Sequence, residues 1–224
     1  KYRVSPAFQR TTQASIDSAT VICGQLRAAA PNAKITWLAG NHEERLTNFM
    51  LDNAIAAFGM RKGMSPDSWP VLSVPYLCRL DDFDIDYLAG YPASSLWINE
   101  HIKVIHGDIV RSNGSTAHAY LNRDKVSVLY GHIHRREWAE VTKTYYDGPH
   151  TVTAASPGCL ARTDGAVPST KGGTDLDGRP LTVHENWQQG LCVVRYEEGD
   201  GKFNLEMIPI AKGWAMYHGK EYTA

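Results

Sequence analysis

The chain has 224 residues, a formal net charge of −1 and 43% apolar residues, which suffices to bury a core without disulfides. This balance gives no overall electrostatic reason to bind nucleic acid or an anionic membrane, and no apolar stretch approaches the roughly 20 residues of a membrane span. The four cysteines are widely spaced without a Cys-x-x-Cys motif, which is typical of a reducing cytosol and predicts neither a zinc knuckle nor a disulfide framework. We therefore expect one cytoplasmic domain over residues 1–224, with no membrane partner.

The first part of the chain alternates between predicted helices and strands. Residues 12–30 have apolar side chains at helical spacing, and Pro31 ends that helix before a strand at residues 34–39. A second helix is predicted at residues 43–58, where apolar side chains recur at positions i, i+3 and i+4. Residues 60–75 are rich in proline and glycine and are predicted to form a connector.

The second part of the chain is predicted to be mostly β-structure. Short strands are expected at residues 85–88, 95–98, 102–105 and 126–130, with a helix at residues 115–122. Further strands are expected as a pair at residues 136–142 and 151–155 and as a hairpin at residues 191–196 and 203–210. Residues 161–190 are polar and rich in glycine and proline, which is typical of a lid, an assembly arm or a disordered segment.

Three polar motifs each follow directly after an apolar run with the length and composition of a buried strand. They are Gly40-Asn41-His42-Glu43 after residues 35–39, His106-Gly107-Asp108 after residues 102–105, and Gly131-His132-Ile133-His134 after residues 126–130. In open α/β sheets, ligands gather at the carboxyl ends of the strands. Imidazole nitrogens and an amide oxygen that converge there are typical metal ligands. The three motifs therefore predict a metal site.

The spacing inside the motifs predicts how each one presents its side chains. His132 and His134 are two residues apart, so in an extended segment both lie on one face, where they can hold one metal or two neighbouring metals. A glycine before Asn41 and before His132 lets the backbone approach the site closely. A helix that begins at His42 points its free N–H groups toward a bound phosphate. Asn41 is alternatively no more than a helix cap.

In this order, the motifs GNHE, His-Gly and GHxH resemble those of the calcineurin-like metallophosphoesterases. The resemblance extends over roughly residues 34–160, and Ser156-Pro157-Gly158 resembles a turn that often follows GHxH in the family. It implies an α/β (α+β) fold in the form of a four-layer αββα sandwich. It also implies a hydrolase that acts on phosphoesters with two divalent metal ions.

The resemblance assigns a role to each matched side chain. Asn41, His106 and His132 resemble ligands of the second metal, and His134 resembles a ligand of the first metal. His42 resembles the catalytic histidine beside the phosphate. These five residues form the candidate site that the resemblance implies.

The sequence departs from the family pattern before GNHE. The upstream motifs Asp-x-His and Gly-Asp-x-x-Asp, which supply most ligands of the first metal in the family, do not occur before Gly40. The chain also starts at Lys1 without a methionine, so we interpret it as the C-terminal part of a longer protein whose N-terminal portion is missing. We expect a protein beginning at Lys1 to bind metal weakly and to be close to inactive.

The implied reaction is the hydrolysis of a phosphomonoester or phosphodiester by a metal-activated hydroxide. Two metals, for which Mn, Fe, Zn and Co all fit the ligands, would lower the pKa of a bridging water, and His42 would protonate the leaving alkoxide. Arg45, Arg111 and Arg135 lie close to the motifs and are candidates to bind the substrate phosphate. Solvated arginines at loop and helix ends are the alternative interpretation of these three residues.

Other functions stay open at this point. A binding scaffold that has lost its chemistry is favoured by the missing upstream acids and opposed by the retained histidines. A nuclease acting on DNA or RNA would need a basic groove near the site. The near-neutral charge and the segment at residues 161–190 favour a small phosphodiester or a nucleotide as the substrate.

Several other polar residues are predicted to have no role in a site. An acidic run alternates with apolar residues, as in a strand with one solvated face; it comprises Asp81, Asp82, Asp84 and Asp86. Residues 175–178 resemble the start of a calcium loop, but the glycine comes too early and Asn186 stands where the loop needs glutamate. His118 is predicted to be structural, and residues 184–185 are assigned no role.

Overall fold

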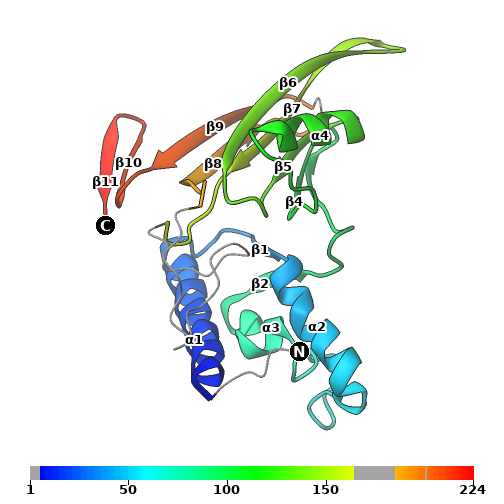
Figure 1. The fold of residues 1–224 in the computed structure, drawn as a ribbon, viewed down its shortest axis with the longest axis vertical. Coiled ribbons are helices and arrows are strands. Elements are labelled where there is room, and N and C mark those ends of the chain that lie inside the picture. The colour runs from blue at the N-terminus through cyan, green and yellow to red at the C-terminus, as the bar shows by residue number, and fades with distance from the viewer. Residues whose placement is uncertain (1–5, 164–184, 200) are drawn as a thin grey trace. The chain divides into compact units, whose positions relative to one another are not determined.

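A computed structural model describes residues 6–163, 185–199 and 201–224. The protein is of the mixed α+β class and divides into two compact units, Lys1–Ser94 and Ser95–Ala224 (Figure 1). Among the described residues, no helix has the length and apolar character needed to cross a membrane. The four-layer αββα sandwich and the single domain stay predictions.

The first unit packs helices against a two-stranded parallel sheet. Its elements are α1 (Pro6–Ala29), β1 (Ile35–Leu38), α2 (Asn41–Asn53), η1 (Ile55–Ala57), α3 (Val74–Leu77), η2 (Leu80–Phe83) and β2 (Ile85–Leu88). Strands β1 and β2 run parallel, with Ile35 opposite Ile85. Cys23 of α1 packs with Cys78, Leu80 and Ile85 in a buried core. This core fixes β1, and therefore the start of the GNHE motif, against α1.

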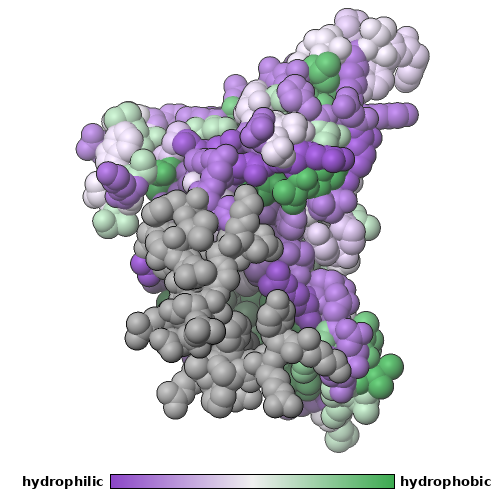
Figure 2. Space-filling view, viewed as in Figure 1, coloured by the Kyte–Doolittle hydropathy of each residue, from purple (hydrophilic) through white to green (hydrophobic). Residues whose placement is uncertain are grey.

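The structure confirms the predicted helix at residues 12–30, which starts earlier, and shortens the next one. Helix α2 ends at Asn53 and does not continue to residue 58. Ala54 leaves helical geometry with φ −149° and ψ 47°. Apolar side chains at this end of α2 stay exposed and form part of the hydrophobic surface in Figure 2; they are Phe49, Leu51, Ile55 and Phe58. Since they are not packed, burial gives no reason to extend the helix.

The acidic run before β2 is not the continuous strand that its alternation predicts. Residues 80–83 form η2, and Asp84 follows with φ 51°, so only Asp86 of the run lies in a strand. Arg27 of α1 donates to the carbonyl oxygens of Phe83 at 2.8 Å and of Asp84 at 2.6 Å. These bonds to α1 hold the chain in a turn, and the prediction that the aspartates are exposed is confirmed.

The second unit is built on a five-stranded mixed sheet. Its elements are β3 (Leu96–Asn99), β4 (Ile102–Ile105), α4 (Ser115–Arg123), β5 (Ser127–Tyr130), β6 (Arg136–Tyr145), β7 (Gly148–Pro157), β8 (Gln189–Tyr196), β9 (Phe203–Ile210), β10 (Trp214–Tyr217) and β11 (Lys220–Thr223). The strand order is β3-β4-β5-β7-β6, in which β4, β5 and β7 run parallel while β3 and β6 are antiparallel edges. The pairs β8–β9 and β10–β11 are antiparallel hairpins.

Different elements cover the two faces of this sheet. Tyr120 of α4 packs with Val128 and Tyr130 of β5 on one face. Leu129 of β5 packs with Phe203 and other residues of the β8–β9 hairpin on the opposite face. Because successive side chains of a strand point to opposite faces, β5 serves both layers, and all of its residues are buried. The ends of β5 are therefore firmly placed.

The predicted strands of the second unit are confirmed, and some are longer than predicted. Strands β6 and β7 have 10 residues each, and the predicted hairpin at residues 191–210 is present as β8–β9. The β10–β11 hairpin is not among the predicted elements. Most of the polar segment at residues 161–190, including residues 175–178 and His184, lies outside the described residues, and its last two residues belong to β8.

Candidate functional site

The carboxyl ends of β4 and β5 bring two of the predicted ligands together. The strands are parallel neighbours, and His106 and His132 follow them directly in the sequence. Gly131 N donates a hydrogen bond to the His106 carbonyl oxygen at 2.9 Å. The imidazole centroids of His106 and His132 lie 5.3 Å apart, with 63° between the ring planes. The prediction that these two histidines meet at one edge of a sheet is confirmed.

Two glycines allow this close approach. A Cβ atom on Gly131 would lie 3.3 Å from the His106 carbonyl oxygen, which is tighter than ordinary packing. Gly107 has φ +98°, and a Cβ atom there would lie 2.9 Å from the Tyr120 hydroxyl oxygen. Glycine is therefore needed at residue 131 for space, and at residue 107 for both space and a left-handed backbone.

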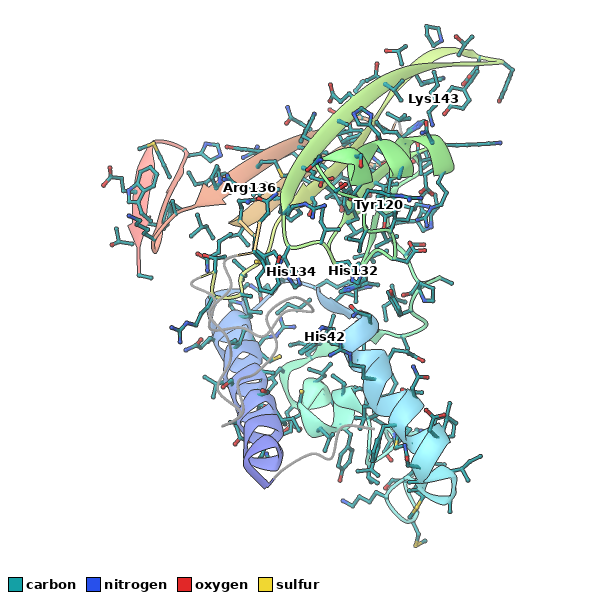
Figure 3. The ribbon with its side chains drawn as sticks, in the orientation of Figure 1. His42, Tyr120, His132, His134, Arg136 and Lys143 are labelled. Atoms are coloured by element: carbon teal, nitrogen blue, oxygen red, sulfur yellow. The ribbon has the colours of Figure 1, made fainter. Side chains whose placement is uncertain are left out.

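The segment Gly131–His134 is not the extended segment that its spacing predicts. His132 has φ 68° and His134 has φ 58°, so the backbone is left-handed at both residues. Figure 3 labels their side chains. Ile133 N donates to the Gly131 carbonyl at 2.8 Å, and its side chain is buried in the core with 5% exposure. Burial of Ile133 holds the turn, although each left-handed residue costs on the order of 1–3 kcal/mol. The expectation that both imidazoles lie on one face of a strand is wrong.

His134 faces a different neighbour from His132. Its imidazole packs edge-to-face against the Trp187 indole, with ring centroids 4.4 Å apart. Gln188 N donates to the His134 carbonyl at 2.9 Å, and the Gln188 side-chain oxygen accepts from Arg136 N at 3.2 Å. These bonds attach the segment before β8 to the GHIH turn and hold Trp187 beside His134.

The end of β7 receives the same segment. Ser156 and Pro157 are still paired with β6, so the turn predicted at Ser156-Pro157-Gly158 is wrong for its first two residues. Gly158 follows with φ +94°, and a Cβ atom on it would lie 2.1 Å from the Gln188 carbonyl oxygen. Cys159 N donates to that oxygen at 3.0 Å. Gly158 and Cys159 therefore support Trp187, and through it His134.

Tyr120 of α4 holds the His106-Gly107-Asp108 turn. Its hydroxyl oxygen accepts from Asp108 N at 2.9 Å and from Ile109 N at 3.1 Å. The side chain is fully buried, and burial raises the pKa of Tyr120, so the hydroxyl stays protonated. Arg123 pairs with Asp108 at 2.8 Å and lies 4.7 Å from the Tyr120 ring centroid. Helix α4 thus fixes the backbone that presents His106.

A buried carboxylate, that of Glu137, stabilises the residues after the GHIH turn. Its Oε2 accepts from the Tyr130 hydroxyl at 3.0 Å and from Ala117 N at 3.1 Å, and its Oε1 accepts from Arg135 Nη2 at 3.0 Å. Arg135 also donates to the Arg111 carbonyl, and its side chain is only 16% exposed. Arg135 is therefore engaged inside the unit, and its role in substrate binding stays a prediction.

The GNHE motif begins α2 in the first unit. The cap residue is Gly40, and Asn41 is the first residue of the helix, so the interpretation of Asn41 as a cap is wrong. The Glu43 carboxylate accepts from Gly40 N at 2.8 Å and from the Trp37 indole nitrogen at 3.3 Å. Glu43 therefore fixes the start of the helix.

His42 and Arg45 lie on exposed positions at the start of α2. Protein atoms around the His42 ring partly desolvate it and lower its pKa; the charge of Arg45 lowers the pKa further, while Glu43 opposes the shift. The imidazole of His42 is therefore mainly neutral near pH 7. Arg111 of the second unit is also exposed.

The donors of the second unit fit part of a metal site. Two imidazoles bound to one metal at about 2.0–2.1 Å in tetrahedral geometry have centroids about 5 Å apart. His106 and His132 match that spacing at 5.3 Å. Over residues 6–163, 185–199 and 201–224, no group of three or more His, Cys, Asp or Glu side chains is arranged to hold a metal ion. The pair fits two ligands of one metal, and Asn41 and His134 as further ligands stay predictions.

Tyr120, Glu137 and Trp187 are the supporting residues that the motifs do not include. Each reaches its motif across the fold, so no local sequence pattern identifies it. A signal exists only for Trp187, because the Ser-Pro-Gly turn predicts that the chain is close-packed where Trp187 arrives.

Comparison with family models, with curated proteins and with solved structures finds no match to this chain. The functional argument therefore rests on the motifs and on the geometry of the residues that carry them. The resemblance to the calcineurin-like metallophosphoesterases stays a hypothesis.

Proposed function

We propose that the protein is a metal-dependent phosphoesterase that hydrolyses a phosphomonoester or a phosphodiester. The observation that carries the proposal is the His106–His132 pair at the carboxyl ends of two parallel strands, with ring centroids 5.3 Å apart. Two local features accompany the pair: a glycine at residue 131, which lets the backbones approach closely, and a left-handed backbone at His132. Such strain is concentrated at functional sites.

The second unit would supply nitrogen ligands in fixed positions. His106 and His132 are the proposed ligands of one metal and His134 of another, and divalent ions held there would supply a hydroxide nucleophile and neutralise phosphate charge. Tyr120 orients His106 through the backbone of the following turn. Trp187 limits rotation of the His134 ring by edge-to-face contact. Supporting residues of this kind raise the affinity of metal ligands by fixing their orientation.

Asn41 is the further proposed ligand and His42 the proposed proton donor to the leaving oxygen, as the family resemblance implies. His42 stands in the first turn of α2, where backbone N–H groups without helical partners favour a phosphate. Its lowered pKa makes the protonated imidazole a stronger acid, although less of it is present at pH 7. Arg45, one turn further along α2, is the proposed partner of a substrate oxygen.

Titration of the whole chain with diamagnetic Zn²⁺ tests the proposal, with imidazole NMR signals as the first readout. We expect the signals of His106 and His132 to shift together, and His132→Ala to abolish the shift of His106. His118→Ala, an exposed histidine of α4, is the matched control and should leave binding unchanged. Metal-induced shifts of equal size in the His132→Ala variant would contradict the proposal.

Hydrolysis of a chromogenic phosphodiester and phosphomonoester is the second readout. We expect the turnover of this chain to be weak and to depend on added metal, and His42→Ala to lower it further without a loss of metal binding. Turnover that is unchanged when a chelator removes the metal would contradict the proposal.

A further inference from the structure

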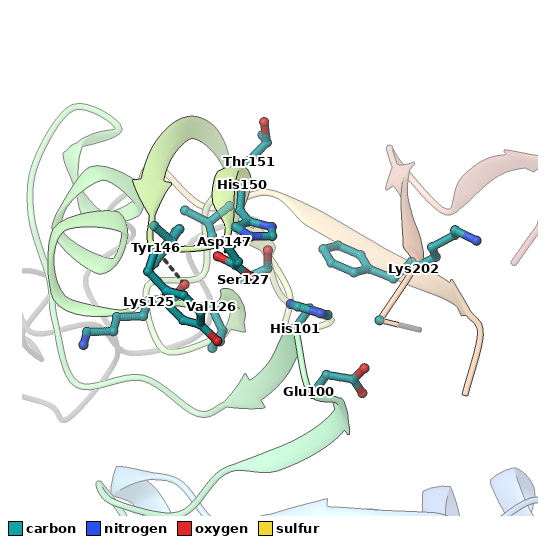
Figure 4. A pocket seen from close by; sticks show the side chains of 14 residues that line it. Glu100, His101, Lys125, Val126, Ser127, Tyr146, Asp147, His150, Thr151 and Lys202 are labelled. Carbon is teal, nitrogen blue, oxygen red and sulfur yellow. Dashed lines mark hydrogen bonds and ion pairs between the residues drawn. The ribbon is translucent and has the colours of Figure 1, made fainter. Parts of the chain in front are cut away.

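A second histidine pair borders a cavity of about 500 Å³ in the second unit (Figure 4). The cavity lies at the amino ends of β4 and β5, which is the opposite edge of the sheet from His106 and His132. Its walls come from the residues before these strands and from the β6–β7 and β8–β9 turns. The volume is within the range of small-molecule sites. No residue of the proposed phosphoesterase site lines this cavity.

The rings of this second pair lie close together and nearly parallel. The imidazoles of His101 and His150 are 22° apart, with centroids separated by 6.3 Å. Ring atoms in contact are about 3.5–4.0 Å apart, so a planar ring between the imidazoles needs a separation of about 7–8 Å, and the two rings would have to move apart by about 1 Å or more to admit it. Tyr145 stands edge-on to His150 at 5.4 Å and closes the cavity on that side.

Contacts with neighbouring residues hold both imidazoles in place. His150 Nε2 lies 3.0 Å from Asp147 Oδ1. The Tyr145 hydroxyl donates to the Lys125 carbonyl at 2.8 Å. A Cβ atom on Gly201 would lie 1.7 Å from the His101 ring, so the backbone of the β8–β9 turn is in contact with that ring. These contacts restrict both rings, and the separation between the rings is what has to change when a base enters.

The polar groups of the cavity indicate which planar ring fits. Asp147 and Glu100 both line it, and the hydrogen bond from His150 lowers the pKa of Asp147, so this carboxylate is ionised near pH 7. Carboxylates accept hydrogen bonds from amino groups on the edge of a heterocycle. Histidine is also among the side chains on which nucleic-acid bases stack.

We propose that this cavity binds a purine base between the imidazoles of His101 and His150, with the exocyclic amino group of the base directed to a carboxylate of the wall. The base belongs either to a free nucleoside or nucleotide or to a single strand. The site is separate from the proposed phosphoesterase site, and binding of the base does not require metal.

Titration of the full chain with adenosine tests this proposal by calorimetry and by NMR of the histidine rings. We expect saturable binding with shifts confined to the signals of His101 and His150. His101→Ala and His150→Ala should each weaken binding about tenfold or more, the size of effect seen when a base loses a stacking partner. His118→Ala should bind like the original protein, and His150→Phe, which keeps an aromatic face, should retain most of the affinity.

Two outcomes would overturn the proposal. One is the absence of any shift of His101 and His150 at millimolar adenosine in a protein whose thermal unfolding is cooperative. The other is an adenosine affinity in the folded His101→Ala and His150→Ala variants that equals the affinity of the original protein. Because His132→Ala leaves this cavity intact, unchanged adenosine binding in that variant separates this proposal from the phosphoesterase proposal.

The source of the base is resolved by three probes on the same chain. Adenosine, adenosine monophosphate and a short single strand of deoxyadenosines carry the same purine ring. Equal affinity for all three supports a free nucleoside, and tighter binding of the monophosphate supports a free nucleotide. Tighter binding of the strand, with an affinity that falls steeply with salt, supports a single-stranded nucleic acid.

Discussion

The two edges of the same sheet carry two histidine pairs with different geometry. At the carboxyl ends of β4 and β5, His106 and His132 are tilted by 63° with centroids 5.3 Å apart. At the amino ends, His101 and His150 are nearly parallel with centroids 6.3 Å apart. Tilted rings can direct nitrogen lone pairs to one point, whereas parallel rings can both stack on a planar ligand. The same residue type is thus suited to a metal at one edge and to a planar ring at the other.

The residues that hold each pair in place also differ between the two edges, in how deeply they are buried. The carboxyl edge is held by buried groups, among them Tyr120 and Glu137, and by glycines that admit no Cβ. The amino edge is held by partly exposed groups, since the side chains of His150 and Asp147 are 42% and 49% exposed. Changes at the carboxyl edge should therefore cost more stability than matched changes at the amino edge.

The largest effect on stability is expected from Glu137→Ala. This change leaves the part-buried guanidinium of Arg135 without its carboxylate and the Tyr130 hydroxyl without its acceptor. Removal of one partner of a fully buried ion pair costs about 3–5 kcal/mol of unfolding free energy, so we expect a loss near the lower end of that range for this part-buried pair. Urea unfolding measures the loss.

Glu140→Ala on the same strand is the control. Its carboxylate is exposed and accepts from Thr153 Oγ1 at 3.1 Å, so the loss should stay below about 1 kcal/mol. A loss in Glu137→Ala no larger than in this control would show that the carboxyl edge is not held as described.

A second prediction compares the loss of one histidine at each edge, with metal binding and adenosine binding measured for both variants. His132→Ala should lower metal affinity by more than the 10- to 100-fold that is typical when a supporting residue is lost, and leave adenosine binding unchanged. His101→Ala should have the reverse pattern. Calorimetry with Mn²⁺ and with adenosine on both variants measures it. If either variant lost both ligands, the two edges would not be separate sites and the comparison would fail.

The positions of both pairs follow from the sequence to different degrees. The apolar runs before His106 and His132 predict β4 and β5, and a parallel pairing of neighbouring strands is enough to bring the two histidines together. The amino-edge pair has no such signal, because His150 belongs to a β6–β7 hairpin whose length of 10 residues per strand exceeds the predicted one. Its register, not its local pattern, brings His150 to His101.

The conformation of the GHIH turn shows where pattern reasoning fails. Period-two spacing predicts a common face for His132 and His134 only if the segment is extended. Burial of Ile133 instead stabilises a turn in which the backbone of both histidines is left-handed. Tyr120 and Glu137 could not be predicted as supporting residues, because their bonds depend on how α4 packs against the sheet and not on a local pattern. The prediction of a continuous strand for the acidic residues before β2 is wrong for a similar reason, since hydrogen bonds from Arg27 of α1 hold these residues in a turn.

A third prediction compares one tyrosine hydroxyl at each edge. Tyr120→Phe leaves the N–H groups of Asp108 and Ile109 without their acceptor, which should cost about 1–3 kcal/mol of unfolding free energy. Metal affinity should fall with it, because the turn after His106 is no longer held. Tyr145→Phe loses one bond to the Lys125 carbonyl and should cost about 0.5–1.5 kcal/mol with metal affinity unchanged. Equal losses of stability and of metal affinity in the two variants would remove the distinction between the edges.

The smallest effect is expected at Asp147, and it depends on pH. The hydrogen bond from His150 lowers the pKa of Asp147 in the folded protein below its ordinary value of 3.8. The folded state therefore favours the ionised carboxylate, and this stabilisation is present above the unfolded pKa and lost as the pH falls through the folded pKa. The stability difference between the original protein and Asp147→Asn should accordingly shrink as the pH falls below about pH 4.

In the His150→Ala background the same difference should lose most of its pH dependence, because the main donor that shifts the pKa of Asp147 is gone. Urea midpoints of the four proteins as a function of pH measure both differences; a pH dependence that persists without His150 would mean that this ring does not hold the carboxylate at the amino edge.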